Sequence, residues 1–159
     1  MISCTFENGN KAFLRHVVVD TLVLKDDKIL LVKRAERLLE GGKWALVGGY
    51  VDQGETLPQA VQREVFEETG YRIHTIQMLA VNADPHRPNE DRQNISFIFV
   101  AEAGEKEGES DDEVSEQKWY GFDDLPPEAT IAFDHYQAIE LYLEYKKNPQ
   151  PLPIIVYER

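Results

Sequence analysis

Cysteine is almost absent from this chain of 159 residues, in which Cys4 is the only one. One thiol excludes an internal disulfide framework and a multi-cysteine zinc site, and it fits a reducing compartment. Long apolar runs are absent too: no stretch of about 18 apolar residues occurs, so we expect no membrane span. The sequence does not begin with a charged segment followed by an apolar run, so no secretory signal is expected and a cytoplasmic location is the default.

Basic residues are also scarce, with 17 Lys and Arg against 29 Asp and Glu and a formal net charge of −12. This charge repels nucleic acid and anionic membranes, so we expect neither as a partner. A phosphorylated substrate would be repelled as well, unless it arrives with metal ions or meets a local cluster of basic side chains. The 42% of hydrophobic residues is enough for a globular protein. The length suits one domain, which we place at residues 1–159.

Alternating and β-branched segments predict a β-rich fold with two or three helices. The first two predicted strands, Phe13–Leu24 and Ile29–Val32, are joined by a tight turn and form a hairpin. A loop follows over residues 33–43, and a strongly acidic loop is expected over residues 103–116. The remaining predicted extended segments are Trp44–Val47, Arg72–Val81, Asn94–Ala101 and Gln117–Phe122.

Two helices are predicted. Thr56 is a suitable N-cap for the first, Pro58 fits its first turn, and Gly70 is placed to end it. The second spans Phe133–Lys147, with Asp134 or Thr130 as its cap. On the first helix the apolar stripe that should face a sheet consists of Leu57, Val61 and Val65.

Three glutamates, Glu64, Glu67 and Glu68, lie along the edge of that stripe. Residues three and four apart are neighbours on a helix, so the carboxylates converge. Such a triple is, by itself, usually a solvated acidic face. A divalent cation is the alternative, because magnesium is held by carboxylate oxygens together with substrate phosphates.

The segment Gly49–Tyr71 resembles the Nudix box, G-x5-E-x7-R-E-U-x-E-E-x-G-U, in which U is a bulky aliphatic residue. Tyr71, at the last U, is the only departure. The resemblance implies an α/β (α+β) fold, an α/β/α sandwich with a central mixed sheet, and a Mg²⁺ or Mn²⁺ cofactor. The positions that match are Gly49, Glu55, Arg63, Glu64, Val65, Glu67, Glu68 and Gly70.

The same resemblance implies roles for residues of the box. The three glutamates would bind the metal, and the backbone carbonyl of Gly49 would add an oxygen. Arg63 and Glu55 would form a bracing pair at the junction of loop and helix, since arginine orients a carboxylate by bidentate bonds. Glu55 could also touch the metal cluster, and a simple surface ion pair is the alternative for both.

The general base is left open by the sequence. Glu64 is one candidate. Glu113 and Glu116 in the acidic loop are others, because either could swing over the metals, although that loop could serve solubility alone. The spacing of Glu113 before Trp119 resembles that of a late catalytic glutamate in some relatives.

Basic residues outside the box are candidates for contact with the substrate. Arg87 and Arg92 lie in the polar loop over residues 82–93, and Arg34 and Arg37 follow the second strand. Any of these guanidinium groups could meet phosphate, and an ordinary turn-rich loop is the alternative for residues 82–93.

Two further features bear on the substrate. Trp44 could stack on a base or pack in the core. The run Ala132–His135, like a proline in the polar loop, resembles the ADP-ribose pyrophosphatases, so His135 joins the substrate-binding candidates, with a helix cap as the alternative.

Together these features predict metal-dependent hydrolysis of a pyrophosphate bond in a nucleoside diphosphate linked to another group, with ADP-ribose or a nucleotide sugar favoured. The alternatives are a house-cleaning nucleoside triphosphate pyrophosphatase and a metabolite sensor that does not turn over. The apolar tail Ile154–Val156 could pair with an edge strand of its own chain or of a second subunit, so a homodimer is a further expectation.

Overall fold

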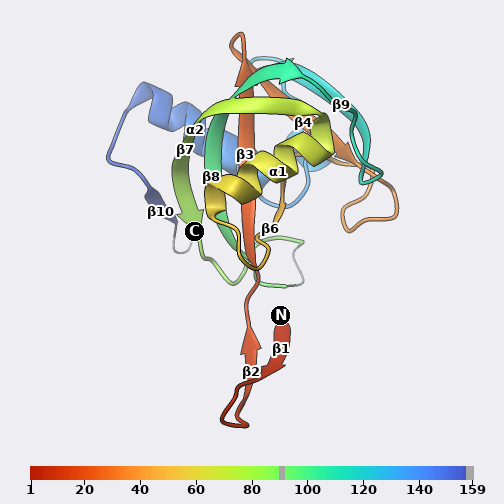
Figure 1. The fold of residues 1–159 in the computed structure, drawn as a ribbon. Coiled ribbons are helices and arrows are strands. Elements are labelled where there is room, and N and C mark those ends of the chain that lie inside the picture. The colour runs from red at the N-terminus through yellow and green to blue at the C-terminus, as the bar shows by residue number, and fades with distance from the viewer. Residues whose placement is uncertain (90–91, 157–159) are drawn as a thin grey trace.

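A computed structural model describes residues 1–89 and 92–156; residues 90 and 91 of the predicted substrate loop and 157–159 of the tail lie outside the described residues. Its main element is an eight-stranded sheet between two helices (Figure 1). The elements are β1 (Ile2–Thr5), β2 (Lys11–Leu14), β3 (Val17–Lys25), β4 (Lys28–Arg34), β5 (Trp44–Ala45), β6 (Val47–Tyr50), α1 (Leu57–Thr69), β7 (Tyr71–Asn82), β8 (Ile95–Lys106), β9 (Val114–Gly121), a 3-10 turn (Glu128–Thr130), α2 (His135–Lys147) and β10 (Ile154–Val156).

The sheet is mixed, as predicted. Its order is β10–β7–β8–β3–β4–β5, with β6 paired to β3 and β9 paired to β4. β3 runs parallel to β8 and β10 runs parallel to β7, whereas the other pairs are antiparallel. Among the described residues, neither helix is long and apolar enough to cross a membrane.

α1 begins and ends where its capping residues predict. The backbone N–H of Thr56 donates to Gln59 Oε1 at 2.8 Å, which forms a capping box. Gly70 has φ 75°, and its N–H donates to the carbonyl of Phe66. This left-handed conformation favours glycine, which explains why the helix stops there.

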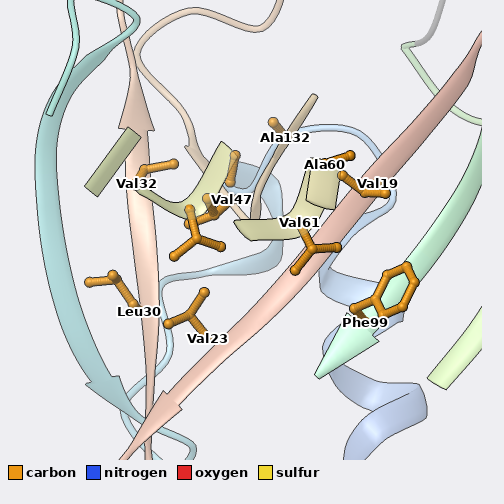
Figure 2. Close-up of a cluster of buried hydrophobic side chains, with 11 residues drawn as sticks. Val19, Val23, Leu30, Val32, Val47, Ala60, Val61, Phe99 and Ala132 are labelled. Carbon is orange, nitrogen blue, oxygen red and sulfur yellow. The ribbon is translucent and has the colours of Figure 1, made fainter. Parts of the chain in front are cut away.

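Two apolar cores lie on opposite faces of the sheet, because side chains alternate along β3. Val19 and Val23 point toward α1, where they pack with Val61 (Figure 2). Leu22 points the other way and packs in the core that includes Ile139 of α2. Burying one such side chain stabilises the fold by about 1.5–3 kcal/mol. The cores therefore hold α1 with its glutamate edge at the border of the sheet.

The predicted bounds of two elements are wrong. The expected strand Phe13–Leu24 is two strands: an unpredicted β1–β2 hairpin ends at Leu14, and β3 begins at Val17. Between them, the Arg15 guanidinium donates to the backbone carbonyls of Ala83 and Gln93 on the body. α2 begins at His135, not Phe133, whose φ of 53° is not helical.

The acidic segment 103–116 is also shorter as a loop than predicted. β8 continues to Lys106 and β9 starts at Val114, since pairing of β8 with β7 extends to Tyr71 and Lys106 despite the acidic side chains. In the tail, β10 pairs with β7 of the same chain, with Ile154 opposite Ala80, so the first of the two pairing alternatives is confirmed.

Candidate active site

A pocket of about 470 Å³ opens beside α1, next to the end of β6. Its acidic lining consists of seven residues and its basic lining of four. Carboxylates therefore outnumber cations, which suits a bound metal ion better than a bare anion. The acidic residues are Asp20, Asp52, Glu64, Glu67, Glu68, Asp111 and Glu113, and the basic residues are Arg34, Arg63, Arg87 and Arg92.

The three predicted glutamates all line this pocket, but their surroundings differ. Glu68 is 6% exposed, and its Oε2 accepts a hydrogen bond from the backbone N–H of Gly48 at 3.2 Å. Glu64 is largely buried, whereas the side chain of Glu67 is about half exposed. The helical spacing thus produces a gradient of burial from the base of the pocket to its rim.

Gly49 brings backbone close to the glutamates. A Cβ placed on Gly49 would lie 2.5 Å from Glu64 Oε1, so a side chain here would displace the carboxylate. The backbone of β6 and the carboxylate of Glu64 therefore share one small space, as the predicted oxygen ligands require.

Arg63 pairs with Glu55, as expected, and also reaches the glutamate cluster. Its Nε and Nη2 donate to the two oxygens of Glu55 at 3.2 and 2.7 Å, and Nη2 also donates to the Tyr50 carbonyl. Its Nη1 donates to Glu64 at 2.7 Å and to Glu67 at 3.1 Å. One guanidinium thus links the loop, the strand end and the helix.

The electrostatics of this cluster fit a cation. Burial is the main cause that raises the pKa of Glu68 well above its usual value, and the charge of Glu64 raises it further. Burial likewise raises the pKa of Glu64, although Arg63 opposes the shift. Carboxylate and carbonyl oxygens are hard donors of the kind that Mg²⁺ prefers, so the residues present suit a divalent metal ion. Among the described residues no three such side chains are already gathered as ligands, and Arg63 is bonded to two of the glutamates instead.

His135 was a predicted substrate contact, but both of its ring nitrogens face protein groups. Nδ1 accepts a hydrogen bond from the Leu46 backbone N–H at 3.0 Å, and Nε2 lies 3.4 Å from Asp20 Oδ1. The side chain is 7% exposed at the edge of the pocket. Burial alone raises the pKa of Asp20, but His135 and Arg87 beside it outweigh burial and hold that pKa below its usual range.

Arg87, also predicted to meet the substrate, is held inside the protein. Its Nε and Nη2 donate to the two carboxylate oxygens of Asp134 at 2.9 and 2.6 Å, and Nη2 lies 3.7 Å from Asp20. Its side chain is 5% exposed. These contacts give Arg87 a structural task that the sequence pattern did not indicate.

Arg34 and Arg92 line the pocket with more open surroundings. The Arg34 guanidinium lies over the ring of Phe133, 5.2 Å from its centroid. Arg92 lies over Tyr50 and donates to its hydroxyl. Each arginine is therefore paired with an aromatic ring at the pocket wall.

Of the remaining candidates, Glu113, Glu116 and Trp44, only the first lines the pocket. Glu116 lies on the same face of β9 as Tyr120, because side chains alternate along a strand. The prediction that Glu116 could reach the metals therefore does not fit the structure. Trp44 packs edge-on against Tyr120 at 5.3 Å in the α2-side core, which is the core-packing alternative.

Among the pocket residues that the sequence analysis missed are Asp20, Tyr50, Asp111 and Phe133. Asp20 had a usable signal, because a carboxylate within the β-branched run of a buried strand is unusual. No feature of the sequence indicated Asp111, since its position depends on a hydrogen bond from its backbone N–H to the Glu67 carbonyl near the end of α1.

Comparison with known proteins finds related sequences. The family model described as NUDIX domain matches residues 14–142. The chain is 36% identical over 132 residues to an ADP-ribose pyrophosphatase of Methanocaldococcus jannaschii, covering 83% of this chain and 75% of that protein. It is 34% identical over 114 residues to the NAD-capped RNA hydrolase NudC of Escherichia coli, covering 69% of this chain but spanning only 42% of NudC.

Solved structures show the same fold. A NUDIX hydrolase from Nitrosomonas europaea superposes with a TM-score of 0.74 at 24% identity, over 99% of this chain and 94% of that one. The NUDIX domain of Shewanella oneidensis NrtR, crystallised with ADP ribose, superposes with a TM-score of 0.69 at 28% identity, over 84% of this chain and 89% of that one.

Proposed function

The chain belongs to the Nudix family and is a pyrophosphohydrolase, and from this premise we propose that it cleaves a nucleoside diphosphate linked to another group, with ADP-ribose or a nucleotide sugar favoured. The observation that carries the proposal is the glutamate cluster of α1 facing Gly49 inside the pocket. The similarity to an ADP-ribose pyrophosphatase and to a domain crystallised with ADP ribose supports the substrate class.

Nudix hydrolases use divalent metal ions, and we propose Mg²⁺ (or Mn²⁺) for this chain. Glu64, Glu67 and Glu68 would hold it, together with the carbonyl of Gly49. A metal ion bound there supplies charge stabilisation at a phosphoryl oxygen. Arg63 would give up its bonds to Glu64 and Glu67 when these carboxylates bind the metal, while its bidentate pair with Glu55 would keep the loop in place.

Side chains around the metal position would carry out proton transfer and substrate binding. Glu113 at the pocket lining, or Glu64, would accept the proton of the attacking water. Arg34 and Arg92 would bind phosphate oxygens. Phe133 and Tyr50 offer aromatic surface on which the nucleobase of the substrate would stack. We propose that all of this takes place within one domain in the cytoplasm.

Glu67→Gln tests the proposal. Because Glu67 is half exposed, the variant should fold as the wild type does, yet lose Mg²⁺-dependent hydrolysis. Glu105→Gln, an exposed carboxylate on β8, is the matched control and should remain active. Full activity of Glu67→Gln would disprove the metal assignment.

A substrate panel separates the alternatives. ADP-ribose, dinucleotides, nucleotide sugars and nucleoside triphosphates are supplied with Mg²⁺, and the broken bond is identified from the products. Preference for triphosphates would favour a house-cleaning enzyme. Tight binding of ADP-ribose without turnover, measured by calorimetry, would favour a sensor.

A further inference from the structure

Arg15 lies between β2 and β3, where the β1–β2 hairpin leaves the body next to the loop that joins β7 to β8 (Figure 1). Its guanidinium donates to four backbone carbonyls of that loop. Nε donates to the carbonyl of Gln93, and Nη1 donates to that of Ala83 at 2.9 Å. Nη2 donates to Asn94 at 3.2 Å and to Asp84 at 3.4 Å. One guanidinium thus joins the first two residues of the loop to its last two.

The loop that Arg15 holds contributes side chains to the pocket. We call its described residues, 83–89 and 92–94, the substrate loop. Of the described residues that line the pocket, Arg87, Arg92 and Asn94 belong to this loop, whereas Arg15 does not line it. Arg15 can therefore act on the contacts of a bound substrate only through the loop.

The position of Arg92 depends on Arg15 more than that of Arg87 does. Arg87 is fixed independently by its bidentate bonds to Asp134. Arg92 is exposed and directly precedes Gln93, whose φ of 53° is a left-handed conformation that residues other than glycine adopt rarely. Such a conformation persists where surrounding contacts hold it, and the carbonyl of Gln93 is one that Arg15 binds. The bond therefore fixes the backbone beside Arg92.

We propose that Arg15 is a positioning residue: it holds the substrate loop so that Arg92 meets a phosphate group of the nucleoside diphosphate in the pocket. The inference rests on the proposed function, in which Arg92 binds phosphate oxygens. A loop that is ordered before binding loses less conformational entropy when the substrate arrives, so this hold should increase affinity. The glutamates of α1 lie outside the loop, so the reaction step itself should not depend on Arg15.

Steady-state kinetics with the substrate that the panel selects tests the inference. Arg15→Gln should raise KM about tenfold, the effect of losing roughly one hydrogen bond to a charged group, and should change kcat by less than about twofold. Arg72→Gln is the matched control, because it removes the same charge from an exposed ion pair with Glu107 and should leave both constants unchanged.

Arg15→Lys separates the bonds of Arg15 from its charge. Lysine keeps the charge but has all its donors on one nitrogen, which cannot bind carbonyls at both ends of the loop as the guanidinium does. This variant should therefore resemble Arg15→Gln, and it serves for every measurement if Arg15→Gln does not fold. A wild-type KM in Arg15→Lys would show that charge alone attracts the substrate and would overturn the inference.

A double-mutant cycle tests whether Arg15 acts through Arg92. Arg92→Gln by itself should raise KM. Adding Arg15→Gln to that variant should raise KM little further, because the two changes remove the same contact with the substrate. A residue that only stabilises the fold would not show this dependence on Arg92. Effects on KM that multiply, or an unchanged KM in Arg15→Gln, would contradict a positioning role.

Hydrogen exchange of the substrate-free protein provides a readout that needs no activity. In Arg15→Gln the amides of the substrate loop should exchange faster than in the wild type, whereas those of β4 should not change. Equal exchange of the loop in both proteins would refute the inference even if hydrolysis is confirmed. Conversely, a wild type that cleaves no member of the panel would refute the proposed function, while the exchange rates would still decide whether Arg15 holds the loop.

Discussion

The backbone N–H of Leu46 donates to Nδ1 of His135 across 3.0 Å, and this bond fixes the tautomer of the ring. Nδ1 needs a free lone pair to accept, so the proton lies on Nε2, which faces Asp20 at 3.4 Å. The bond to His135 therefore connects α2 to the residues just before Gly48. The backbone N–H of Gly48 in turn donates to Glu68 of α1. The position of β6 beside the glutamates is set from both faces of the sheet.

Replacing His135 by Leu should therefore destabilise the protein. The Leu46 N–H would lose its acceptor and Asp20 a buried partner, which costs about 3 kcal/mol of unfolding free energy. His135→Asn keeps an oxygen near the Nδ1 position and should lose less. Urea unfolding of both variants measures the difference, with the exposed His86→Asn as the control. Equal stability of His135→Leu and wild type would mean that the ring does not hold β6.

The two neighbouring glycines should respond differently to alanine. At Gly49 the new Cβ would meet the Glu64 carboxylate, which can swing away, so Gly49→Ala should fold. Because it displaces Glu64, apparent Mg²⁺ affinity should fall about tenfold or more, as for groups that orient metal ligands. Mg²⁺ titration of the hydrolysis rate provides the measurement.

Gly48 has no such freedom. A Cβ there would lie 2.0 Å from the backbone carbonyl of Val19 in the paired strand β3. Gly48→Ala should therefore destabilise the sheet by about 1–3 kcal/mol or more. A thermal unfolding midpoint equal to that of wild type would show that the strands can separate locally.

The part of the site that follows from local spacing was predictable. The cap at Thr56, the stop at Gly70 and the convergence of the glutamates all depend on residues within one helix and its flanks. Here the relevant distances are set by helix geometry, which the sequence alone specifies. The Arg63–Glu55 pair was instead expected from the resemblance to the Nudix box, because Glu55 precedes the helix.

The contacts of Arg87 and His135 were not predictable, because they depend on how distant segments pack. Asp134, at the N-cap of α2, and Asp20 of β3 both contact Arg87, and no local pattern predicts that these segments meet. The hairpin was missed for a different reason: Lys11 and Ala12 are depleted in strands, and Phe13 was assigned to the following strand. Whether residues 1–159 act as one domain stays a prediction.

Glu113 and Glu116 should differ in their effect on the reaction. Glu113 lines the pocket, and its charge acts on Glu64, whereas Glu116 lies on the other face of β9. If Glu113 is the general base, Glu113→Gln should lower kcat by about 10²-fold or more, and Glu116→Gln should leave it unchanged. Steady-state rates at saturating Mg²⁺ decide this. An unchanged kcat in both variants would assign the base to Glu64, and a loss confined to Glu116→Gln would contradict the structure.

Glu68→Gln should change how stability depends on pH in the absence of metal. The folded protein holds the pKa of Glu68 well above its unfolded value, mainly through burial. Above the ordinary pKa of 4.5 the unfolded state has lost this proton and the folded state keeps it, so stability falls as pH rises until the folded pKa is passed. A neutral glutamine removes this loss, and Glu68→Gln should be more stable than wild type at pH 8 with EDTA present.

Urea unfolding at pH 5 and pH 8 measures the slope for each protein. Glu67→Gln is the control, because it leaves Glu68 buried and should retain the fall of stability with pH. Mg²⁺ added at pH 8 should stabilise the wild type, since a cation compensates the buried carboxylate, and should stabilise Glu68→Gln far less. If wild type and Glu68→Gln share one pH profile, Glu68 is already compensated without metal, and its burial would not be an argument for a cation site.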